Sequence, residues 1–180
     1  MTNYRRDRTA GGSYFFTLNL ADRRSRLLVG HIELLRAAFR AVKAPHPFVV
    51  DAIVVLPDHL HAVWTLPSND ADYALRWRLI KTRFSRSLPR GEPRVASRQG
   101  KGERGIWQRR YWEHRIRDDR DFAAHVDYVH INPVRHGLVA ATRDWPYSSF
   151  RRYVREGTLA PDWAQAPDRA QSGSSFGERR

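Results

Sequence analysis

Two apolar runs separated only by Pro57 and Asp58 constrain the fold of this chain more than any other feature. Residues 48–56 and 59–67 are rich in β-branched and aromatic side chains, which favour strands, whereas the Pro-Asp pair favours a turn. A turn this short predicts that the two runs pair as neighbouring antiparallel strands. The sequence therefore predicts a β-hairpin near the middle of the chain.

Amphipathic helix patterns flank this hairpin on both sides. In residues 25–44 apolar side chains recur at steps of three and four, and Ser25 is a candidate N-cap. A second pattern covers residues 69–88, with Asn69 or Asp70 as the candidate cap. The other face of this second helix is basic and carries Arg76, Arg78, Lys81, Arg83 and Arg86.

The remaining segments complete a known order of elements. Residues 13–20 and 106–118 predict a first and a fourth strand, residues 119–136 predict a third helix with Gly137 beyond its end, and one more short helix follows. This order predicts an α+β, ferredoxin-like sandwich: an antiparallel sheet of four or five strands with helices on one face, plus a C-terminal helical extension. We expect one domain over residues 1–165 and a disordered tail at 166–180, where apolar residues are scarce.

Charge and composition narrow the classes of function. The 32 Lys and Arg residues against 19 Asp and Glu give a net charge of +13, which suits a polyanion such as nucleic acid better than a membrane surface. A charge that serves only solubility is the simpler alternative. The absence of cysteine excludes disulfides, thiolate metal sites and cysteine nucleophiles. No secretory pattern or bilayer-length apolar run is present, so a cytoplasmic protein is expected.

The second strand of the hairpin carries two histidines one residue apart. Side chains two residues apart in a strand share a face, so His59 and His61 stand side by side while Leu60 points the other way. Two neutral imidazoles in this arrangement can chelate one divalent cation. A His-X-His motif alone is more often a pair of packing or surface residues, so further evidence is needed.

The third predicted helix carries a tyrosine and an asparagine on one face. Tyr128 and Asn132 are four residues apart, and Pro133 predicts that Asn132 lies at a helix end or kink where its amide can reach outward. Taken alone, a helical tyrosine is usually a residue at the edge of the core, and Asn-Pro is usually a turn signal. The apolar face of the same helix, expected to pack on the sheet, comprises Phe122, Val126 and Val129.

Four motifs in order carry a resemblance to a known family. They are "DHLH" at 58–61, "RRYWEHRIRDDRDF" at 109–122, "YVHINPVRHG" at 128–137 and "DWPYSSF" at 144–150. With their spacing, they resemble the REP-associated tyrosine transposases, relatives of the single-tyrosine HUH transposases that cut single-stranded DNA. The similarity extends from about residue 13 to residue 153.

The resemblance implies an activity and assigns roles to residues. It implies that His59, His61 and Asn132 hold a divalent metal and that Tyr128 is the nucleophile. The enzyme would nick and rejoin hairpin DNA of repetitive extragenic palindromes, in the nucleoid, through a covalent 5′-phosphotyrosine. Mg²⁺ or Mn²⁺ is the expected ion, although two imidazoles would also accept Zn²⁺ or Ni²⁺. A monomer is expected and a dimer stays open, because related insertion-sequence enzymes exchange this helix between subunits.

DNA contacts and the activation of the tyrosine are less well defined by the sequence. His125 and His130 flank Tyr128 and are candidate helpers for a phenol whose ordinary pKa is near 10, although a helical histidine is more often a surface residue. A water-activating metallonuclease and a non-catalytic hairpin-binding protein remain alternative functions. The candidates for phosphate contact are Lys81, Arg83, Arg109, Arg110 and Arg115, with Trp112 as a candidate base-stacking residue or, alternatively, a core residue.

Overall fold

The computed structural model describes residues 7–91 and 104–164 of the chain. Its strands are β1 (Ser13–Asn19), β2 (Val49–Val55), β3 (His59–Thr65) and β4 (Trp112–Arg115). Its helices are α1 (Leu27–Gly30), α2 (Ile32–Lys43), α3 (Tyr73–Ser87), α5 (Asp119–Arg135) and α6 (Phe150–Arg155), with a 3-10 turn η1 (Thr142–Asp144). Among these described helices, none is both long and apolar enough to cross a membrane.

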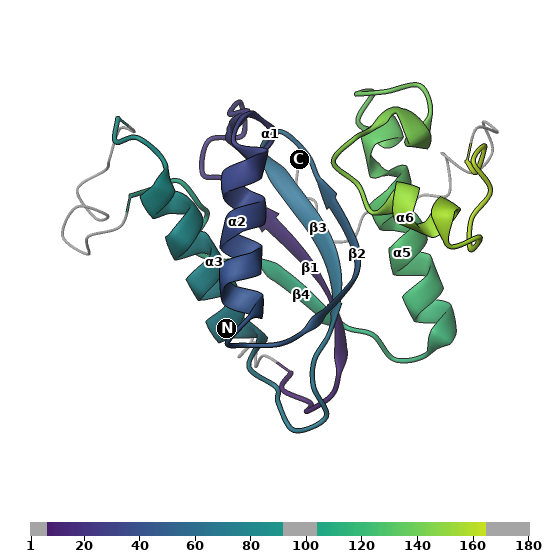
Figure 1. Ribbon diagram of the computed structural model, residues 1–180, viewed down its shortest axis with the longest axis horizontal. Helices are drawn as coiled ribbons and strands as arrows, with labels where there is room; N and C mark the ends of the chain where they lie inside the picture. The colour runs from purple at the N-terminus through teal and green to yellow at the C-terminus, as the bar shows by residue number, and fades with distance from the viewer. Residues whose placement is uncertain (1–6, 92–103, 165–180) are drawn as a thin grey trace, which may run out of the picture.

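The four strands form one antiparallel sheet in the order β2-β3-β1-β4. Helices α2 and α3 cover one face, and the C-terminal helices α5 and α6 lie on the opposite side (Figure 1). This confirms the predicted α+β ferredoxin-like class, the hairpin of β2 and β3 and the C-terminal helical extension. Within this extension, α5 packs directly on the sheet and forms a second helical layer on its other face.

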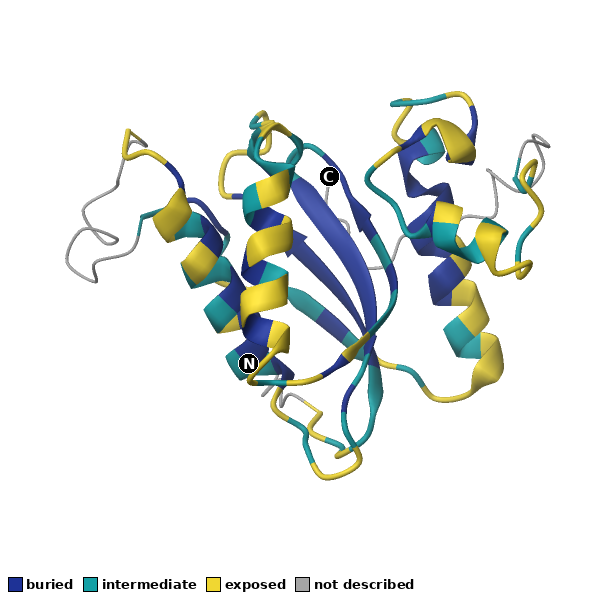
Figure 2. Ribbon diagram, in the orientation of Figure 1, coloured by how far each residue is buried: buried dark blue, intermediate teal, exposed yellow. Residues whose placement is uncertain are grey.

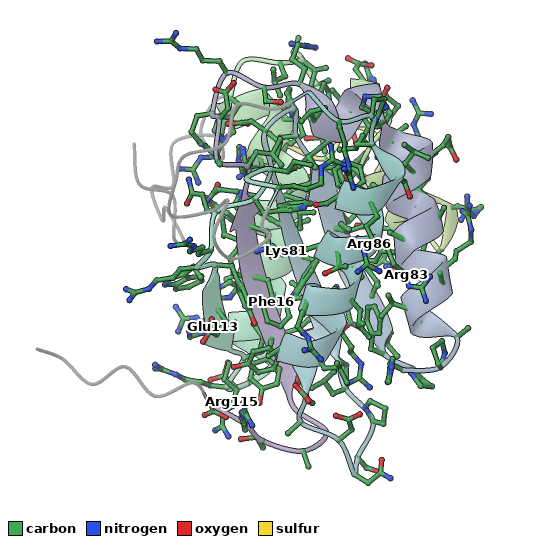
Figure 3. The ribbon with its side chains drawn as sticks, turned by 90° about the vertical axis from the view of Figure 1, so that its left-hand side faces the viewer. Phe16, Lys81, Arg83, Arg86, Glu113 and Arg115 are labelled. Carbon is green, nitrogen blue, oxygen red and sulfur yellow. The ribbon has the colours of Figure 1, made fainter. Side chains whose placement is uncertain are left out.

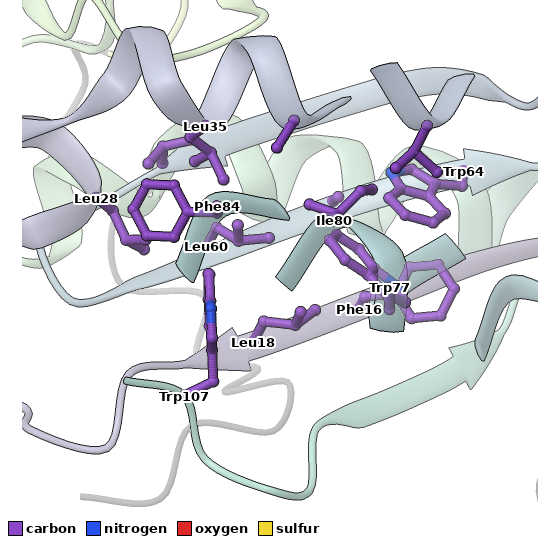
Figure 4. Packing of buried hydrophobic residues seen from close by; sticks show 14 of the residues in the cluster. Phe16, Leu18, Leu28, Leu35, Leu60, Trp64, Trp77, Ile80, Phe84 and Trp107 are labelled. Carbon is purple, nitrogen blue, oxygen red and sulfur yellow. The ribbon is translucent and has the colours of Figure 1, made fainter. Parts of the chain in front are cut away.

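A large aromatic cluster fills the space between the sheet and the pair α2 and α3. Trp64 of β3 stacks on Trp77 of α3 with ring centroids 3.9 Å apart, and Phe16 of β1 meets Trp77 edge-on at 5.4 Å. Leu60 points into the same layer, as the strand alternation predicts (Figure 4). Burial of several large side chains makes this layer the main hydrophobic core.

A second, smaller core lies between the sheet and α5. Phe15 of β1, Val54 of β2 and Val63 of β3 pack there against Val126 and Val129 of the helix. Phe122 also packs against this cluster, so the predicted apolar face of the third helix is confirmed. The central strands β1 and β3 are buried along most of their length (Figure 2), so their polar residues Thr17, His59 and His61 lie inside the protein.

Several predicted boundaries were wrong. The first helical pattern is divided at His31 into α1 and α2, where glycine at position 30 weakens the helix. Asp72 caps α3 by accepting a hydrogen bond from the backbone N–H of Leu75, and not Asn69 or Asp70. The fourth strand covers only Trp112–Arg115 of the predicted 106–118.

The position of Asn132 in α5 differs from the prediction. The helix continues through Pro133 to Arg135, so Asn132 lies inside its last turn and not at its end. Proline lacks the N–H that would bond to the carbonyl oxygen of Val129, but the chain still keeps helical geometry. The predicted tail at 166–180 lies outside the described residues, as do residues 92–103.

Candidate active site and nucleic-acid interface

The histidine pair lies at the start of β3 on the face that α5 covers. His59 is 2% exposed and His61 is fully buried, with ring centroids 5.1 Å apart. In the sheet register His61 pairs with Thr17 and His59 with Asn19 on the neighbouring strand β1. The prediction that both imidazoles project from one face is therefore confirmed, and that face is closed over by the helix.

A polar neighbour fixes the Nδ1 atom of each imidazole. The Asp58 carboxylate accepts a hydrogen bond from His59 Nδ1 at 2.8 Å, and the Thr17 hydroxyl lies 2.9 Å from His61 Nδ1. Burial raises the pKa of Asp58, but the hydrogen bond from His59 and the charges of His59 and Arg23 outweigh it, so that its pKa lies below the usual value. Both rings thus engage a partner through Nδ1, which makes Nε2 the nitrogen suited to bind a metal ion.

One stripe of α5 faces this pair. Tyr128 meets His61 edge-on with ring centroids 5.2 Å apart, and His136 at the helix end lies 5.0 Å from the ring of His59. Asn132 is one turn from each of them on the same helix face and is 1% exposed. The structure therefore brings Tyr128 of α5 and His136 at the end of this helix against the two histidines within one chain, with Asn132 between them on the same face of the helix.

Arg135 adds a positive charge beside the tyrosine. Its guanidinium carbon lies 5.1 Å from the centroid of the Tyr128 ring, a distance typical of a cation–π contact. Arg135 is seven residues after Tyr128, so two helical turns bring it back over the same face. A permanent cation at this place suits a reaction in which negative charge grows on a phosphate.

The two helper candidates beside Tyr128 lie in different environments. His125 packs on Phe15, whose ring also contacts Tyr128, so it belongs to the same side of the helix. His130 instead contacts Ser149 through Nε2 at 2.9 Å and packs on Tyr153 near α6. Burial, with a smaller effect of the Arg152 charge, lowers the pKa of His130 to about 3, so it is neutral at physiological pH.

A second group of possible metal ligands joins β4 to the start of α5. One ligand atom from each of His114, Asp121 and His125 lies within 4.8 Å of the others, so the group could hold a metal ion. His114 Nε2 lies 2.8 Å from Asp121 Oδ2 and His125 Nδ1 lies 3.0 Å from Asp121 Oδ1. The two rings are stacked at an interplanar angle of 17°, and the Asp121 carboxylate lies within hydrogen-bond distance of both.

A basic groove of about 840 Å³ lies on the other side of the sheet, between α3 and residues 104–111. Lys81 and Arg109 of the predicted phosphate contacts line it, together with Arg78, Arg86 and Trp107. Lys81 donates to the backbone carbonyl of Gln108 at 2.9 Å, which joins the two walls. Figure 3 shows Lys81, Arg83 and Arg86 along α3, with Glu113 and Arg115 on β4.

Comparisons with known proteins decide the family. No protein-family model matches the sequence. The chain is 48% identical over 169 residues, 93% of its length and 96% of the relative, to a Haemophilus influenzae protein named "Putative REP-associated tyrosine transposase". It is 46% identical over 164 residues, 91% of its length and 92% of the relative, to the REP-associated tyrosine transposase of Escherichia coli K12. The chain belongs to the REP-associated tyrosine transposases.

A solved structure of this family agrees with the fold. The chain matches a REP-associated tyrosine transposase solved in complex with a REP hairpin, with 44% identity and a TM-score of 0.84, covering all of this chain and 99% of that one. The resemblance inferred from the four motifs is thus confirmed. The transposase fold and the buried His, His, Tyr and Asn cluster occur together in one described chain.

The other predicted DNA contacts of this transposase are dispersed. Arg83 and Arg110 are exposed but are not among the residues that line the groove. Arg115 donates to the Thr9 hydroxyl at 2.9 Å, toward the N-terminal segment. Trp112 packs against Phe15 and is half-buried in the second core, which favours the alternative that it is a packing residue.

The sequence did not reveal several residues of the site. Thr17 is paired with His61 across the sheet, and no local signal predicts that register. Asp58 and Arg135 could have been linked to the site from the sequence. Asp58 directly precedes His59, and Arg135 is two helical turns after Tyr128.

Proposed function

We propose that the chain is a metal-dependent DNA nicking and joining enzyme that acts on REP hairpin DNA through Tyr128. The observation that carries this proposal is the contact of Tyr128 with His61, 5.2 Å between ring centroids, inside one chain. The REP hairpin bound to the related transposase supports the substrate, since this chain is 44% identical to that protein. A DNA substrate of this kind implies a cytoplasmic, nucleoid-associated protein.

The proposed reaction transfers a phosphoryl group without loss of the phosphoester. The hydroxyl oxygen of Tyr128 gives up its proton to solvent and attacks the scissile phosphorus, a P–O bond to the tyrosine forms, and the bond from phosphorus to the 3′ oxygen breaks. The 3′ oxygen leaves as a hydroxyl group after taking a proton, and the 5′ end stays attached to Tyr128. Attack by a 3′ hydroxyl on this link reverses the chemistry and rejoins a strand.

The donor set fits a divalent ion. His59 and His61 would bind it through Nε2 and Asn132 through its amide oxygen, leaving positions for water and phosphate, as Mg²⁺ or Mn²⁺ prefers. Such an ion supplies charge neutralisation at the non-bridging phosphate oxygens. Asp58 and Thr17 hold the imidazoles in orientation, and Arg135 adds charge beside the phenol. Because Tyr128 and His61 meet within one chain, a monomer suffices.

The His114, Asp121 and His125 group is the second place where an ion could bind. It lies beside the site, since His125 and Tyr128 both contact Phe15. We assign the reactive ion to His59 and His61 because a hydrogen bond at Nδ1 holds each ring and because the ring of His61 faces Tyr128. An ion at the second group would fasten β4 to α5.

A covalent adduct tests the proposed function. A labelled REP hairpin with a single-stranded foot is incubated with the protein and Mn²⁺, and the products are resolved on a denaturing gel. Protein with Tyr128 intact should yield a protein–DNA adduct, Tyr128→Phe should yield none while it still binds the hairpin, and Tyr147→Phe should behave as the unchanged protein. Loss of the histidines in His59→Ala/His61→Ala should also abolish the adduct.

Two other results would contradict the proposal. Cleavage without an adduct, persisting in Tyr128→Phe, would assign the chain to the metallonucleases. Tight hairpin binding without any product under Mg²⁺ or Mn²⁺ would make it a binding protein only.

A further inference from the structure

A small hollow beside His59 is lined by three arginines. It has a volume of about 260 Å³, and its lining includes Arg23, Arg24, Arg26, His59 and His136. We name it the arginine pocket. It opens next to the ring of His59, on the side where His136 approaches that ring to 5.0 Å.

The loop that carries the arginines is fixed against the turn before β3. The backbone N–H of Leu20 donates to the carbonyl of Asp58 at 2.8 Å, and that of Leu28 donates to the carbonyl of Pro57 at 3.2 Å. The Arg23 side chain adds an ion pair, with Nε 3.1 Å from Asp58 Oδ2. These contacts at both ends hold the loop in register with His59.

The charge of the arginine pocket suits a phosphodiester. The carboxylate in the pocket lining is that of Asp58, and it already interacts with Arg23 and His59. The side chains of Arg24 and Arg26 are exposed to solvent. Arginine presents a planar set of donors that matches phosphate oxygens and stays charged at any physiological pH. A backbone phosphate is therefore the ligand that fits this pocket.

The arginine pocket also continues the path of the basic groove. The groove wall at 106–109 is hydrogen-bonded to the end of β1, since Gln108 N–H donates to the carbonyl of Asn19 and Ala21 N–H to the carbonyl of Ile106, both at 2.9 Å. The arginine loop begins two residues later. A DNA strand that followed the groove around this end of the sheet would reach the arginine pocket, whose lining includes His59.

We infer that the arginine pocket is a phosphate subsite for the single-stranded segment next to the scissile bond. Arg24 and Arg26 bind backbone phosphates of that segment and position the neighbouring phosphate between His59 and Tyr128. The inference rests on the proposed function and adds to it the place where the single strand enters the site. The hairpin stem, by contrast, has no role in the arginine pocket.

Salt-dependent binding of the Tyr128→Phe protein tests the subsite without interference from cleavage. Arg24→Ala/Arg26→Ala is compared with Arg40→Ala/Arg155→Ala, which removes the same charge from exposed positions on α2 and α6. The probe is a labelled hairpin with a single-stranded foot, and affinity is measured by fluorescence anisotropy from 50 to 300 mM salt. The slope of log affinity against log salt is negative, and the loss of two single-strand phosphate contacts should reduce its magnitude by about 1.4.

A second probe separates the single strand from other sources of phosphate. With a blunt hairpin that lacks the foot, the Arg24→Ala/Arg26→Ala change should alter neither affinity nor slope relative to the Arg40→Ala/Arg155→Ala protein. Equal slopes of the two double variants on the footed hairpin would overturn the inference, as would an equal loss on both hairpins. Inorganic phosphate that displaces the foot at matched ionic strength would also overturn it, in favour of a free-anion site.

The subsite and the proposed function can fail separately. The covalent adduct is scored with Tyr128 intact, whereas the subsite is scored by the binding slope with phenylalanine in its place. A slope change without any adduct supports the subsite and contradicts the nicking activity. An adduct with an unchanged slope does the opposite.

Discussion

The carboxylate of Asp58 accepts a hydrogen bond from Nδ1 of His59 at 2.8 Å and, through its other oxygen, pairs with Arg23 at 3.1 Å. Asp58 therefore connects the imidazole that we assign to the metal with the loop that we assign to the DNA. A carboxylate behind a metal-binding histidine fixes the orientation of the ring and raises the basicity of its other nitrogen.

Asp58→Ala should weaken metal activation by roughly 10- to 100-fold, the usual cost of removing such a partner. The measurement is the rate of adduct formation as the Mn²⁺ concentration is varied. The concentration for half-maximal rate should rise, while the rate at saturating Mn²⁺ falls less. Asp144→Asn, at an exposed carboxylate in η1, serves as control and should leave both values unchanged. An unchanged Mn²⁺ dependence in Asp58→Ala would remove Asp58 from the site.

Arg135→Met should slow adduct formation by up to about a hundredfold, the lower end of the cost of losing one preorganised charge donor. The reason is that its guanidinium lies 5.1 Å from the Tyr128 ring, beside the place where charge develops. Single-turnover rates at saturating hairpin and Mn²⁺ measure the effect. Arg155→Met at an exposed site on α6 is the matched control, and equal rates for the two variants would show that Arg135 only packs on the ring.

The groove between α3 and residues 104–111 should contribute to hairpin affinity. Lys81→Ala and Arg109→Ala each remove a cation from the groove lining, so each should reduce the salt slope of hairpin binding by about 0.9 for one phosphate contact in duplex DNA. Anisotropy titrations of the Tyr128→Phe protein at several salt concentrations give this slope. Arg40→Ala on α2 should leave it unchanged, and a similar change in all three variants would show only a dependence on net charge.

The sequence predicted which helices and strands form the layers of this protein better than it predicted where each of them begins and ends. Period-two and period-3.6 patterns identified the hairpin of β2 and β3 and the helices α2 and α3, because burial of one face produces those periods directly. The predicted ends of β4 were wrong, because they depend on hydrogen bonds to residues remote in sequence. The predicted start of α3 was wrong, because it depends on which of several neighbouring polar residues caps the helix.

The candidate site shows the same division. Residues on one strand or one helix, such as His59 with His61 and Tyr128 with Asn132, could be grouped from spacing alone. That the strand and the helix face each other follows from α5 packing on the far side of the sheet, which no local pattern encodes. The roles of Thr17 and of the arginine pocket also could not be predicted from local patterns. Thr17 meets His61 through the pairing of β1 with β3, and the pocket forms where the arginine loop packs on the turn before β3.

Arg76 is the clearest case in which the helix pattern was wrong. It was grouped with the exposed basic face of α3, but it is 1% exposed and donates to the backbone carbonyls of Asp72 and Pro47 at 2.9 and 2.8 Å. Its Nη2 also pairs with Asp70 at 2.7 Å. The guanidinium joins α3 to the chain before β2, so the side chain is part of the structure and not of the DNA-binding surface.

Arg76→Met should therefore lower the free energy of unfolding by about 1 to 3 kcal/mol, because buried carbonyl oxygens lose their donors. Urea unfolding at pH 7 measures the change. Arg83→Met, an exposed position on the same helix, should change stability by less than about 0.5 kcal/mol. If both variants unfold at the same urea concentration, the hydrogen bonds of Arg76 contribute nothing to stability.

His130 makes stability depend on pH in a defined direction. In the folded chain burial holds its pKa at about 3, below the ordinary value of 6.5, so below pH 6.5 the unfolded chain binds a proton that the folded chain does not. The stability that this neutral histidine contributes is therefore fully present above pH 6.5 and is lost as the pH falls toward 3. Between pH 7 and pH 5 the loss from this one group is about 2 kcal/mol.

His130→Gln should remove that part of the acid sensitivity. Its side-chain amide can still donate to Ser149 but does not titrate, so the free energy of unfolding should fall by about 2 kcal/mol less between pH 7 and pH 5 than in the unchanged protein. Urea unfolding at both pH values gives the comparison, and each protein serves as its own reference for the cost of the substitution itself. His125, whose pKa burial also lowers, remains in both proteins and cancels in the difference. Parallel loss of stability in the two proteins would show that His130 accepts its proton in the folded state and that burial does not keep it neutral.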